Sequence, residues 1–358
     1  MPMADRSILG SSARDVRRAL LWGLFWAGLV VLGIYVGSRG LKDFDVALVS
    51  YAGASVFSAF GLGYRYSMWL NRPPTRLYWR RTWALFLRPR RLTANLIHLT
   101  GLLWENFVAQ RFILRRSKTR WVAHWFIAWG CILAAAVTFP LSFGWVRFET
   151  PPDSQEFYNA YVFGLHLFTF RLGTLKAYTI FYVLDIAAVM VLVGIFFSLL
   201  RRTRSRDALA VQQFPNDILP LVLLFAISVT GLFLTVSSAF LHGFHYVFLS
   251  EIHAVTVIFT LLYLPFGKFF HIFQRPAQLG VAFYREEGRR GEQARCARCK
   301  EPFASRMHVD DLKAVERDLS IDFSMSGGAH YQDVCPACRR KNLALAQGGL
   351  WLGSRERS

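Results

Sequence analysis

The stretch that decides the fold is IHAVTVIFTLLYLPFGKFFHI, residues 252–272. Its only charged side chain is that of Lys268. A helix needs about 20 mostly apolar residues to cross a hydrocarbon core of about 30 Å. The sequence therefore predicts a membrane-spanning helix over this stretch.

Similar apolar stretches precede it along the chain. Hydrophobic residues make up 54% of the 358 positions and charged residues only 18%, which excludes a wholly soluble protein and a disordered one. We therefore predict an all-α, polytopic membrane helix bundle of about six spans. The five further spans are expected near residues 19–37, 47–70, 122–145, 175–200 and 218–240.

The basic residues are unevenly distributed between these spans. The net charge is +19, and the loop between the second and third spans holds many arginines against the single acid Glu105. By the positive-inside rule this loop and both termini lie in the cytoplasm, so we expect a multi-pass protein of the inner (cytoplasmic) membrane. The arginines flank spans and form no nucleic-acid-binding motif, so we expect contact with anionic lipid and no nucleic-acid partner. Residues 92–114 are expected to form a helix along the membrane interface.

The composition becomes polar after residue 275. We expect a membrane domain over residues 1–275, a linker over 276–290 and a small cytoplasmic metal-knuckle domain over 291–358, with one helix at 309–319. Two Cys-x-x-Cys pairs give this domain four thiolates: Cys296, Cys299, Cys335 and Cys338. This spacing predicts one tetrahedral structural metal site. Zinc is preferred, and rubredoxin-like iron is the alternative, since Lys300 and Arg339 stand where rubredoxin knuckles favour glycine.

Several histidines lie in or beside the predicted spans, where an unpaired imidazole is costly. His253 and His271 are 18 residues apart, which is five helical turns or about 27 Å, so one helix face would carry one near each membrane surface. His124, at the start of the third span, would share its depth with His271. Two neutral imidazoles from different helices can bind one haem iron axially.

These residues also carry a resemblance. The stretch around Gln110 and Arg111, followed by HWFIAWG at 124–130, resembles the cytochrome b membrane subunits of heterodisulfide-reductase-like and sulfite-reduction-associated complexes. The last span, with LPFGKFFH at 264–271, is similar to the final helix of respiratory nitrate reductase gamma subunits. The resemblance implies axial haem ligation by His271 and His253, with His124 as the partner of His271. It also implies electron exchange between membrane quinone and a peripheral iron–sulfur protein.

The chain departs from the nitrate reductase pattern at one point. A second ligand on the helix that holds the first is replaced here by Ala134, Ala135 and Ala136. The outer haem therefore takes its second ligand from elsewhere or is absent, so one or two haems b are expected. The candidates, in order, are His166, His242 and His245.

Two acids are candidates for proton handling. Asp185 lies inside the fourth predicted span, where it either pairs with a basic residue or belongs to a proton path to quinone. Glu251 lies two residues before His253 and either accepts a quinol proton or starts a helix for dipole reasons. Cys131 is expected to serve packing.

The favoured function is a haem b membrane anchor that passes electrons between quinone and a cytoplasmic iron–sulfur oxidoreductase with its own catalytic subunit. The chain itself would be the electron-transfer, quinone-reactive subunit of that enzyme. The alternatives are a polytopic transporter with a regulatory zinc ribbon and a haem-free membrane scaffold.

Overall fold

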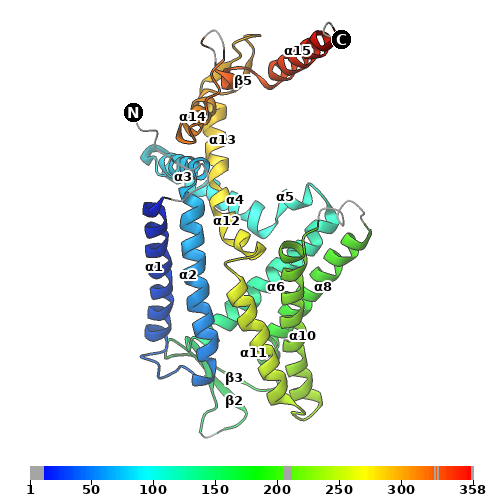
Figure 1. Ribbon diagram of the computed structural model, residues 1–358. Coiled ribbons are helices and arrows are strands. Elements are labelled where there is room, and N and C mark those ends of the chain that lie inside the picture. The colour runs from blue at the N-terminus through cyan, green and yellow to red at the C-terminus, as the bar shows by residue number, and fades with distance from the viewer. Residues whose placement is uncertain (1–11, 153, 205–211, 326–327, 329, 356–358) are drawn as a thin grey trace. The chain divides into compact units, whose positions relative to one another are not determined.

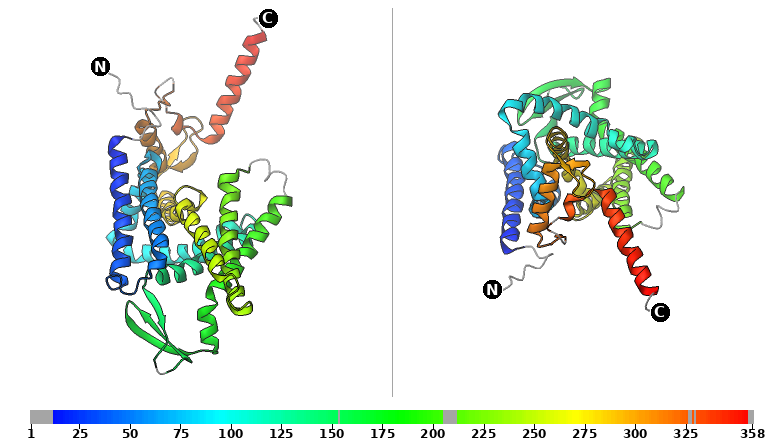
Figure 2. Two further views of the ribbon diagram at one scale, coloured as in Figure 1. Left: turned by 60° about the horizontal axis from the view of Figure 1, so that its bottom comes forward. Right: turned by 90° about the horizontal axis from the view of Figure 1, so that it is seen from above.

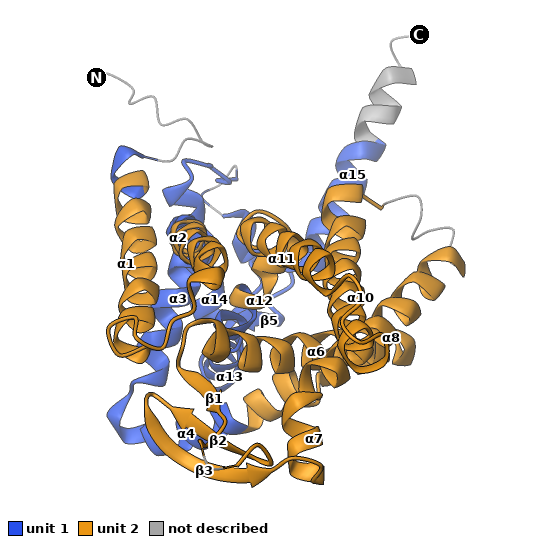
Figure 3. Ribbon diagram, turned by 90° about the horizontal axis from the view of Figure 1, so that it is seen from below, with its two compact units in different colours: residues 1–15, 68–100, 274–358 blue, residues 16–67, 101–273 orange. Residues whose placement is uncertain are grey.

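The computed structural model describes residues 12–152, 154–204, 212–325, 328 and 330–355, with side chains described as far as residue 348. The chain forms two compact units (Figure 3). Unit 1 comprises residues 1–15, 68–100 and 274–358, and unit 2 comprises residues 16–67 and 101–273.

Six helices in the described part of the chain are long and apolar enough to cross a membrane (Figure 1). They are α1 (Ala13–Gly37), α2 (Val49–Asn71, preceded by the 3-10 turn Val46–Leu48), α6 (Lys118–Ser142), α8 (Val183–Arg204), α10 (Leu219–Phe240, preceded by the π turn Phe214–Ile218) and α11 (Tyr246–Tyr263). Apolar side chains such as Leu24 and Phe259 are more than half exposed on them, as expected for surfaces that face lipid. The predicted polytopic helix bundle is confirmed, and the chain is a multi-pass membrane protein.

Small residues let the spans of unit 2 approach closely. A Cβ atom added to Gly130 of α6 would lie 2.8 Å from the carbonyl oxygen of Ala187 in α8, and one added to Gly194 of α8 would lie 2.7 Å from that of Ala123 in α6. Gly63 of α2 meets the Trp22 carbonyl of α1 in the same way, at 2.8 Å. Glycine at such positions allows backbone contact between membrane helices.

Several span boundaries differ from the predicted ones, and three of them have a clear local cause. The third span ends at Ser142, two residues before the left-handed Gly144 (φ 70°). The fourth begins at Val183, because residues 175–181 form the separate helix α7 (Leu175–Phe181). The last span ends at Tyr263, since Pro265 has no N–H to continue the ladder and the turn that follows leads to Gly267.

A small antiparallel sheet of unit 2 lies between α6 and α7 in the chain. Its strands are β1 (Val146–Glu149), β2 (Phe157–Val162) and β3 (Leu165–Arg171), in the order β1-β2-β3. The two-residue loop Phe163–Gly164 has positive φ at both positions, as a type I′ hairpin requires. Figure 2 shows the sheet next to the ends of α6 and α7, where Ala160, Phe170 and Ala177 form a buried cluster.

Unit 1 combines the segment after α2 with the C-terminal region. Its elements are α3 (Pro73–Phe86), α4 (Leu92–Leu103, whose last residues pass into unit 2), α13 (Gly280–Arg290), β4 (Gln293–Arg295), β5 (Pro302–Ser305), α14 (Arg306–Asp318) and α15 (Pro336–Arg355). Helix α12 (His271–Gln278) joins the units along the chain. The residues expected as a linker, 276–290, are largely helical as α13, and the helix expected at 309–319 is α14.

A buried carboxylate connects three helices of unit 1. Asp311 of α14, which is 4% exposed, accepts hydrogen bonds from the Tyr284 hydroxyl of α13 and from Arg81 Nη2 of α3, both at 2.8 Å. Burial and this carboxylate raise the pKa of Tyr284. The predicted basic loop therefore also holds the polar C-terminal region, through ion pairs such as Arg76–Asp318 and Arg88–Glu287.

Candidate functional site

The side chains of His124 and His271 lie together in unit 2. His124 is in the second turn of α6, and His271 is the first residue of α12; their ring centroids are 6.4 Å apart and the ring planes make an angle of 67°. The two residues are 147 positions apart in the chain. The fold therefore brings together the two histidines that the sequence analysis paired.

Each of these rings is oriented through its Nδ1 atom. His124 Nδ1 lies 2.7 Å from Oε1 of Gln110, a residue 4% exposed that adopts the left-handed conformation (φ 49°) between the π turn Trp104–Val108 and α5 (Arg111–Leu114). His271 Nδ1 lies 2.5 Å from the carbonyl oxygen of Lys268. Both acceptors require a proton on Nδ1, which assigns the lone pair to Nε2 in each ring.

The His253 ring is also oriented by a hydrogen bond at Nδ1, near the start of α11. It lies in the second turn of α11, and its Nδ1 is 2.9 Å from Oγ1 of Thr230 in α10. That hydroxyl donates to the Ala226 carbonyl at 2.7 Å, so it accepts from the imidazole and again leaves the lone pair on Nε2. A Cβ atom at Gly231 would lie 3.3 Å from His253 Cε1, so the ring packs directly on the α10 backbone.

The prediction that His253 and His271 share one continuous helix face is wrong. Helix α11 ends at Tyr263, residues 268–270 form a 3-10 turn, and His271 begins a separate helix. Pro265 removes a donor from the helix ladder, and the extended Gly267 (φ −90°, ψ −160°) turns the chain. The position of His271 is therefore set by this break and not by helical periodicity.

The candidates for a second outer ligand lie on three different pieces of structure. His166 is in β3, where its Nε2 is 3.0 Å from Thr169 Oγ1. His242 (φ 50°) and His245 (φ 53°) belong to the turn between α10 and α11. Within the ranges that the structure describes, no contact joins any of them to His253, and their assignment stays a prediction.

A cavity of about 420 Å³ in unit 2 contains Asp185. Asp185 lies in the first turn of α8, nearer the end of the span than the sequence predicted, and its Oδ1 accepts a hydrogen bond of 2.7 Å from Thr235 Oγ1. Three aromatic side chains, Tyr178, Phe181 and Tyr182, form the apolar wall. Thr235 is four residues beyond Gly231, so along α10 the cavity is about one turn from the level of His253.

Glu251 is exposed in the second turn of α11, among the residues that precede His253. It is not part of the cavity lining. The structure therefore places Asp185, and not Glu251, in a partly open cavity with polar and aromatic neighbours. Cys131 is half-buried in α6 and is not a member of the cysteine cluster.

The four cysteines of the tail lie together. Their sulfur atoms are all within 4.8 Å of one another, and Cys299 Sγ and Cys335 Sγ are 3.8 Å apart. A tetrahedral zinc site with Zn–S bonds of about 2.3 Å has sulfur atoms about 3.8 Å apart. Donor set and spacing therefore fit a tetrahedral metal such as zinc or iron.

The knuckle backbone supports the thiolate form of Cys296. Burial opposes ionisation, but the N–H groups of Cys335 (3.2 Å) and Arg298 (3.4 Å) point at Cys296 Sγ, and together with that of Cys299 they lower the pKa of this thiol to about 6. Lys300 adopts the left-handed conformation (φ 64°) where a glycine was noted as typical of rubredoxin knuckles. The core beside the site is small, with Val334 as its buried aliphatic residue and Phe303 and Met325 packed against it.

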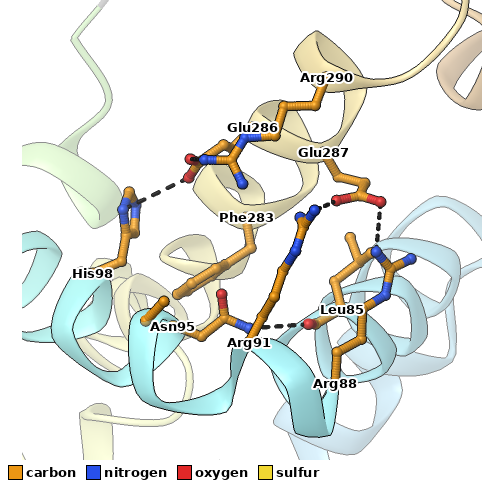
Figure 4. A pocket seen from close by; sticks show the side chains of 10 residues that line it. Leu85, Arg88, Arg91, Asn95, His98, Phe283, Glu286, Glu287 and Arg290 are labelled. Carbon is orange, nitrogen blue, oxygen red and sulfur yellow. Dashed lines mark hydrogen bonds and ion pairs between the residues drawn. The ribbon is translucent and has the colours of Figure 1, made fainter.

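A second cavity, of about 190 Å³, lies between α3, α4 and α13 within unit 1 (Figure 4). Its charged groups are paired internally. Arg88 and Arg91 bind the two carboxylate oxygens of Glu287, at 2.6 and 3.3 Å, while His98 Nδ1 is 3.6 Å from Glu286. The ion pairs connect α13 with α4 and with the turn between α3 and α4, so this cavity is a structural junction.

Gln110, Thr230 and Thr235 are the site residues whose roles the sequence did not reveal. Gln110 stood in the stretch that carried the resemblance, without a role. The two threonines lie in an apolar span, where every hydroxyl needs a hydrogen-bond partner. Their presence there was the sequence feature that could have indicated a role for them. Comparisons of the chain with protein-family models, curated proteins and solved structures found no match.

Proposed function

We propose that the chain is a haem b membrane subunit that passes electrons between membrane quinone and a peripheral cytoplasmic iron–sulfur oxidoreductase. The observation that carries this proposal is the His124–His271 pair. Two imidazoles bound on opposite sides of one iron, with metal–nitrogen bonds of about 2 Å, have ring centroids about 6 Å apart. The centroid separation of 6.4 Å between His124 and His271 agrees with that requirement.

The hydrogen bonds of the pair support the same assignment. A metal-binding histidine usually donates its other ring N–H to an oxygen, which fixes the tautomer and strengthens the ligand. Gln110 Oε1 and the Lys268 carbonyl take this part for His124 and His271. Haem b held by the two Nε2 atoms would supply one-electron transfer at this level.

His253 is the proposed ligand of an outer haem, with its second ligand among His166, His242 and His245. Thr230 Oγ1 accepts the hydrogen bond from His253 Nδ1, as Gln110 Oε1 does from His124 Nδ1. His253 lies near the start of α11, and His271 follows its end, so the two levels are at opposite ends of the span. Electrons can then cross the membrane between the two ends.

The Asp185 cavity is the proposed quinol site. Its aromatic wall suits a planar ring, and Thr235 and Asp185 offer hydrogen-bonding groups at one end. A quinol hydroxyl that donates to the Asp185 carboxylate can transfer its proton there during oxidation. Asp185 lies at the start of α8, and His253 lies near the start of α11. This placement supports quinol reaction on the outer side.

The charge distribution supports the inner membrane and a cytoplasmic partner. The basic loop after α2 and the acids of the C-terminal region form ion pairs within unit 1, so both lie on one side of the membrane. The positive-inside rule makes this side cytoplasmic. The tail metal is proposed to be zinc in a structural role.

The test is the reduced-minus-oxidised absorption spectrum of the purified protein and its variants. His271→Ala and His124→Ala should each remove the same haem, while His98→Ala, outside the spans, should leave the spectrum unchanged. A wild-type protein without haem after expression with added haem precursor would refute the proposal. Equal haem content in wild type and His271→Ala would refute the ligand assignment alone.

The quinol site has its own test. Asp185→Asn should slow reduction of the haem by a quinol analogue about 100-fold, in the range of a lost general base, with haem content unchanged. Glu251→Gln serves as the matched carboxylate control and should reduce at nearly the wild-type rate. Reversed behaviour of the two variants would move the site to Glu251.

A further inference from the structure

The turn that presents His271 is an interrupted helix. Between Tyr263, where α11 ends, and His271, the chain passes through Pro265 and Gly267 and then a 3-10 turn. In a continuous helix the Leu261 carbonyl would accept from residue 265, but proline has no N–H, so this carbonyl accepts from the Leu264 N–H at 3.2 Å and can take a second donor. The break also takes the Pro265 carbonyl out of the helix ladder. Inside a membrane such carbonyl groups need other donors.

One face of α2 supplies donors to this break. The Ser58 hydroxyl donates to the Leu261 carbonyl, and Arg65 Nη1 donates to the carbonyl of Pro265 and, at 3.4 Å, to that of Gly267. Between them Gly61 admits the proline ring, because a Cβ atom there would lie 2.8 Å from Pro265 Cβ. Positions 58, 61 and 65 follow helical spacing, so a single stripe of α2 matches successive steps of the break.

Arg65 extends this contact as far as the residue before His271. Its guanidinium carbon lies 4.3 Å from the centre of the Phe270 ring. Phe270 is 3% exposed and closes the 3-10 turn that begins at Lys268, whose carbonyl binds His271 Nδ1. One side chain thus contacts the first and last parts of the turn that carries both His271 and its hydrogen-bond acceptor.

We propose that Arg65 is the positioning residue for His271: by binding the carbonyls of the interrupted helix and stacking on Phe270, it fixes where the His271 ring lies relative to His124. The ligand role of His271 rests on the proposed function. The fixation of the turn does not, because it follows from contacts within the protein. An arginine inside a span is costly, and these contacts are what compensate for its cost.

The experiment compares Arg65→Gln, Arg65→Lys and the control Arg72→Gln in the full chain reconstituted in lipid nanodiscs. Arg72 is exposed and lies just beyond the end of the same helix. Two measurements are made: the low-spin electron paramagnetic resonance signal of the oxidised haem, whose g values depend on the angle between the two imidazole planes, and hydrogen–deuterium exchange of the peptide 261–271. The second measurement is independent of haem.

Arg65→Gln is expected to retain haem, to shift the largest g value and to exchange the amides of this peptide about tenfold faster, as for the loss of one hydrogen bond to a charged group. Arg65→Lys should give an intermediate shift, since its ammonium reaches a carbonyl but does not stack as a guanidinium does. Arg72→Gln should match the wild type.

If Arg65→Gln keeps both the g values and the exchange rates of the wild type, the inference is overturned. If Arg65→Gln fails to accumulate, Arg65→Lys replaces it, with a smaller acceleration and a smaller g shift expected, and wild-type values of both overturning the inference. A wild-type protein without haem refutes the proposed function, and the exchange rates then decide on Arg65 alone.

Discussion

The cysteine cluster of the tail and the histidines of the membrane helices are both candidate ligand sets, but they are assembled differently. In the tail, two short knuckles bring four sulfur atoms within 4.8 Å of one another, and backbone N–H groups of the knuckles themselves support the thiolate of Cys296. In the membrane, His124 and His271 come from distant segments. The tautomer of His124 is fixed by Gln110, 14 residues away, and that of His271 by the Lys268 carbonyl of its own turn, which is held by contacts from α2. A local motif carries its own geometry, whereas a long-range pair depends on the fold around it.

The largest effect is expected at the metal site of the tail, where the four ligands come from two short local motifs. Cys335→Ser should lower the metal content from about one per chain to none and unfold the region around β4 and β5, because metal binding of about 10–16 kcal/mol exceeds what so small a core supplies. The measurements are elemental analysis and limited proteolysis of the full-length protein. Cys131→Ser is the matched control and should retain metal. A protease-resistant, metal-free tail in Cys335→Ser would remove the distinction between the two sites.

The next effect tests whether the histidine pair depends on its surroundings. Gln110→Ala removes the acceptor of His124 Nδ1 without touching either ring, and it should weaken haem retention about 10- to 100-fold, as for other residues that orient metal ligands. Haem loss into apomyoglobin measures this directly. Gln213→Ala, an exposed glutamine before α10, is the control. Haem retention equal to that of the wild type would mean that His124 is oriented by packing alone.

These two cases explain what the sequence could predict. The six spans followed from apolar length, and the cysteine cluster followed from spacing, because both signals are local. The turn that carries His271 did not follow, since its position depends on contacts from Ser58 and Arg65, which are about 200 residues away in the chain. Pro265 and Gly267 are helix breakers, but the apolar length of the stretch and the 18-residue spacing of its histidines favour one continuous helix.

The sheet and the Asp185 cavity could not be predicted for a related reason. The residues 146–171 contain aromatic side chains and a Phe163–Gly164 turn that are typical of a hairpin, but the expectation of an all-helical chain took precedence. Asp185 was expected deep in a span, and the separate helix α7 places it in the first turn of α8 instead. Its partner Thr235 is 50 residues away, and no local pattern predicts that contact.

A smaller effect is expected at the outer histidine. Thr230→Val keeps the shape of the side chain and removes the acceptor of His253 Nδ1, so it should weaken haem retention at that level about fivefold, the equivalent of one neutral hydrogen bond of about 1 kcal/mol. The measurement is a redox titration that resolves the two proposed haem levels, and the proposed His124–His271 level serves as the internal control. A loss at the His124–His271 level instead would show that the two levels are coupled through α10 and α11.

The smallest effect concerns a site that joins a local and a distant partner. Asp43, 2% exposed in the loop after α1, binds Arg39 four residues away at 2.7 Å and the remote Arg147 of β1 at 2.6 Å. The hydrogen bond from Arg39 is the main cause that holds the pKa of Asp43 below its ordinary value, and Arg147 adds to the shift. A carboxylate whose pKa is lowered in the folded state stabilises the fold above its unfolded pKa of about 4. This stabilisation is lost as the pH falls through the folded pKa.

Asp43→Asn should therefore melt a few degrees below the wild type at pH 7, and the difference should shrink as the pH is lowered from about 5 towards 3. The measurement is thermal unfolding of the detergent-solubilised protein across this range, with Asp45→Asn, whose carboxylate caps the following 3-10 turn through Ala47 N at 2.9 Å, as a nearby carboxylate control. Arg39→Gln and Arg147→Gln then separate the two partners. If the local partner decides, as in the cysteine knuckles, Arg39→Gln should remove most of the pH dependence; a larger loss in Arg147→Gln would place this site with the histidines, whose geometry depends on distant segments.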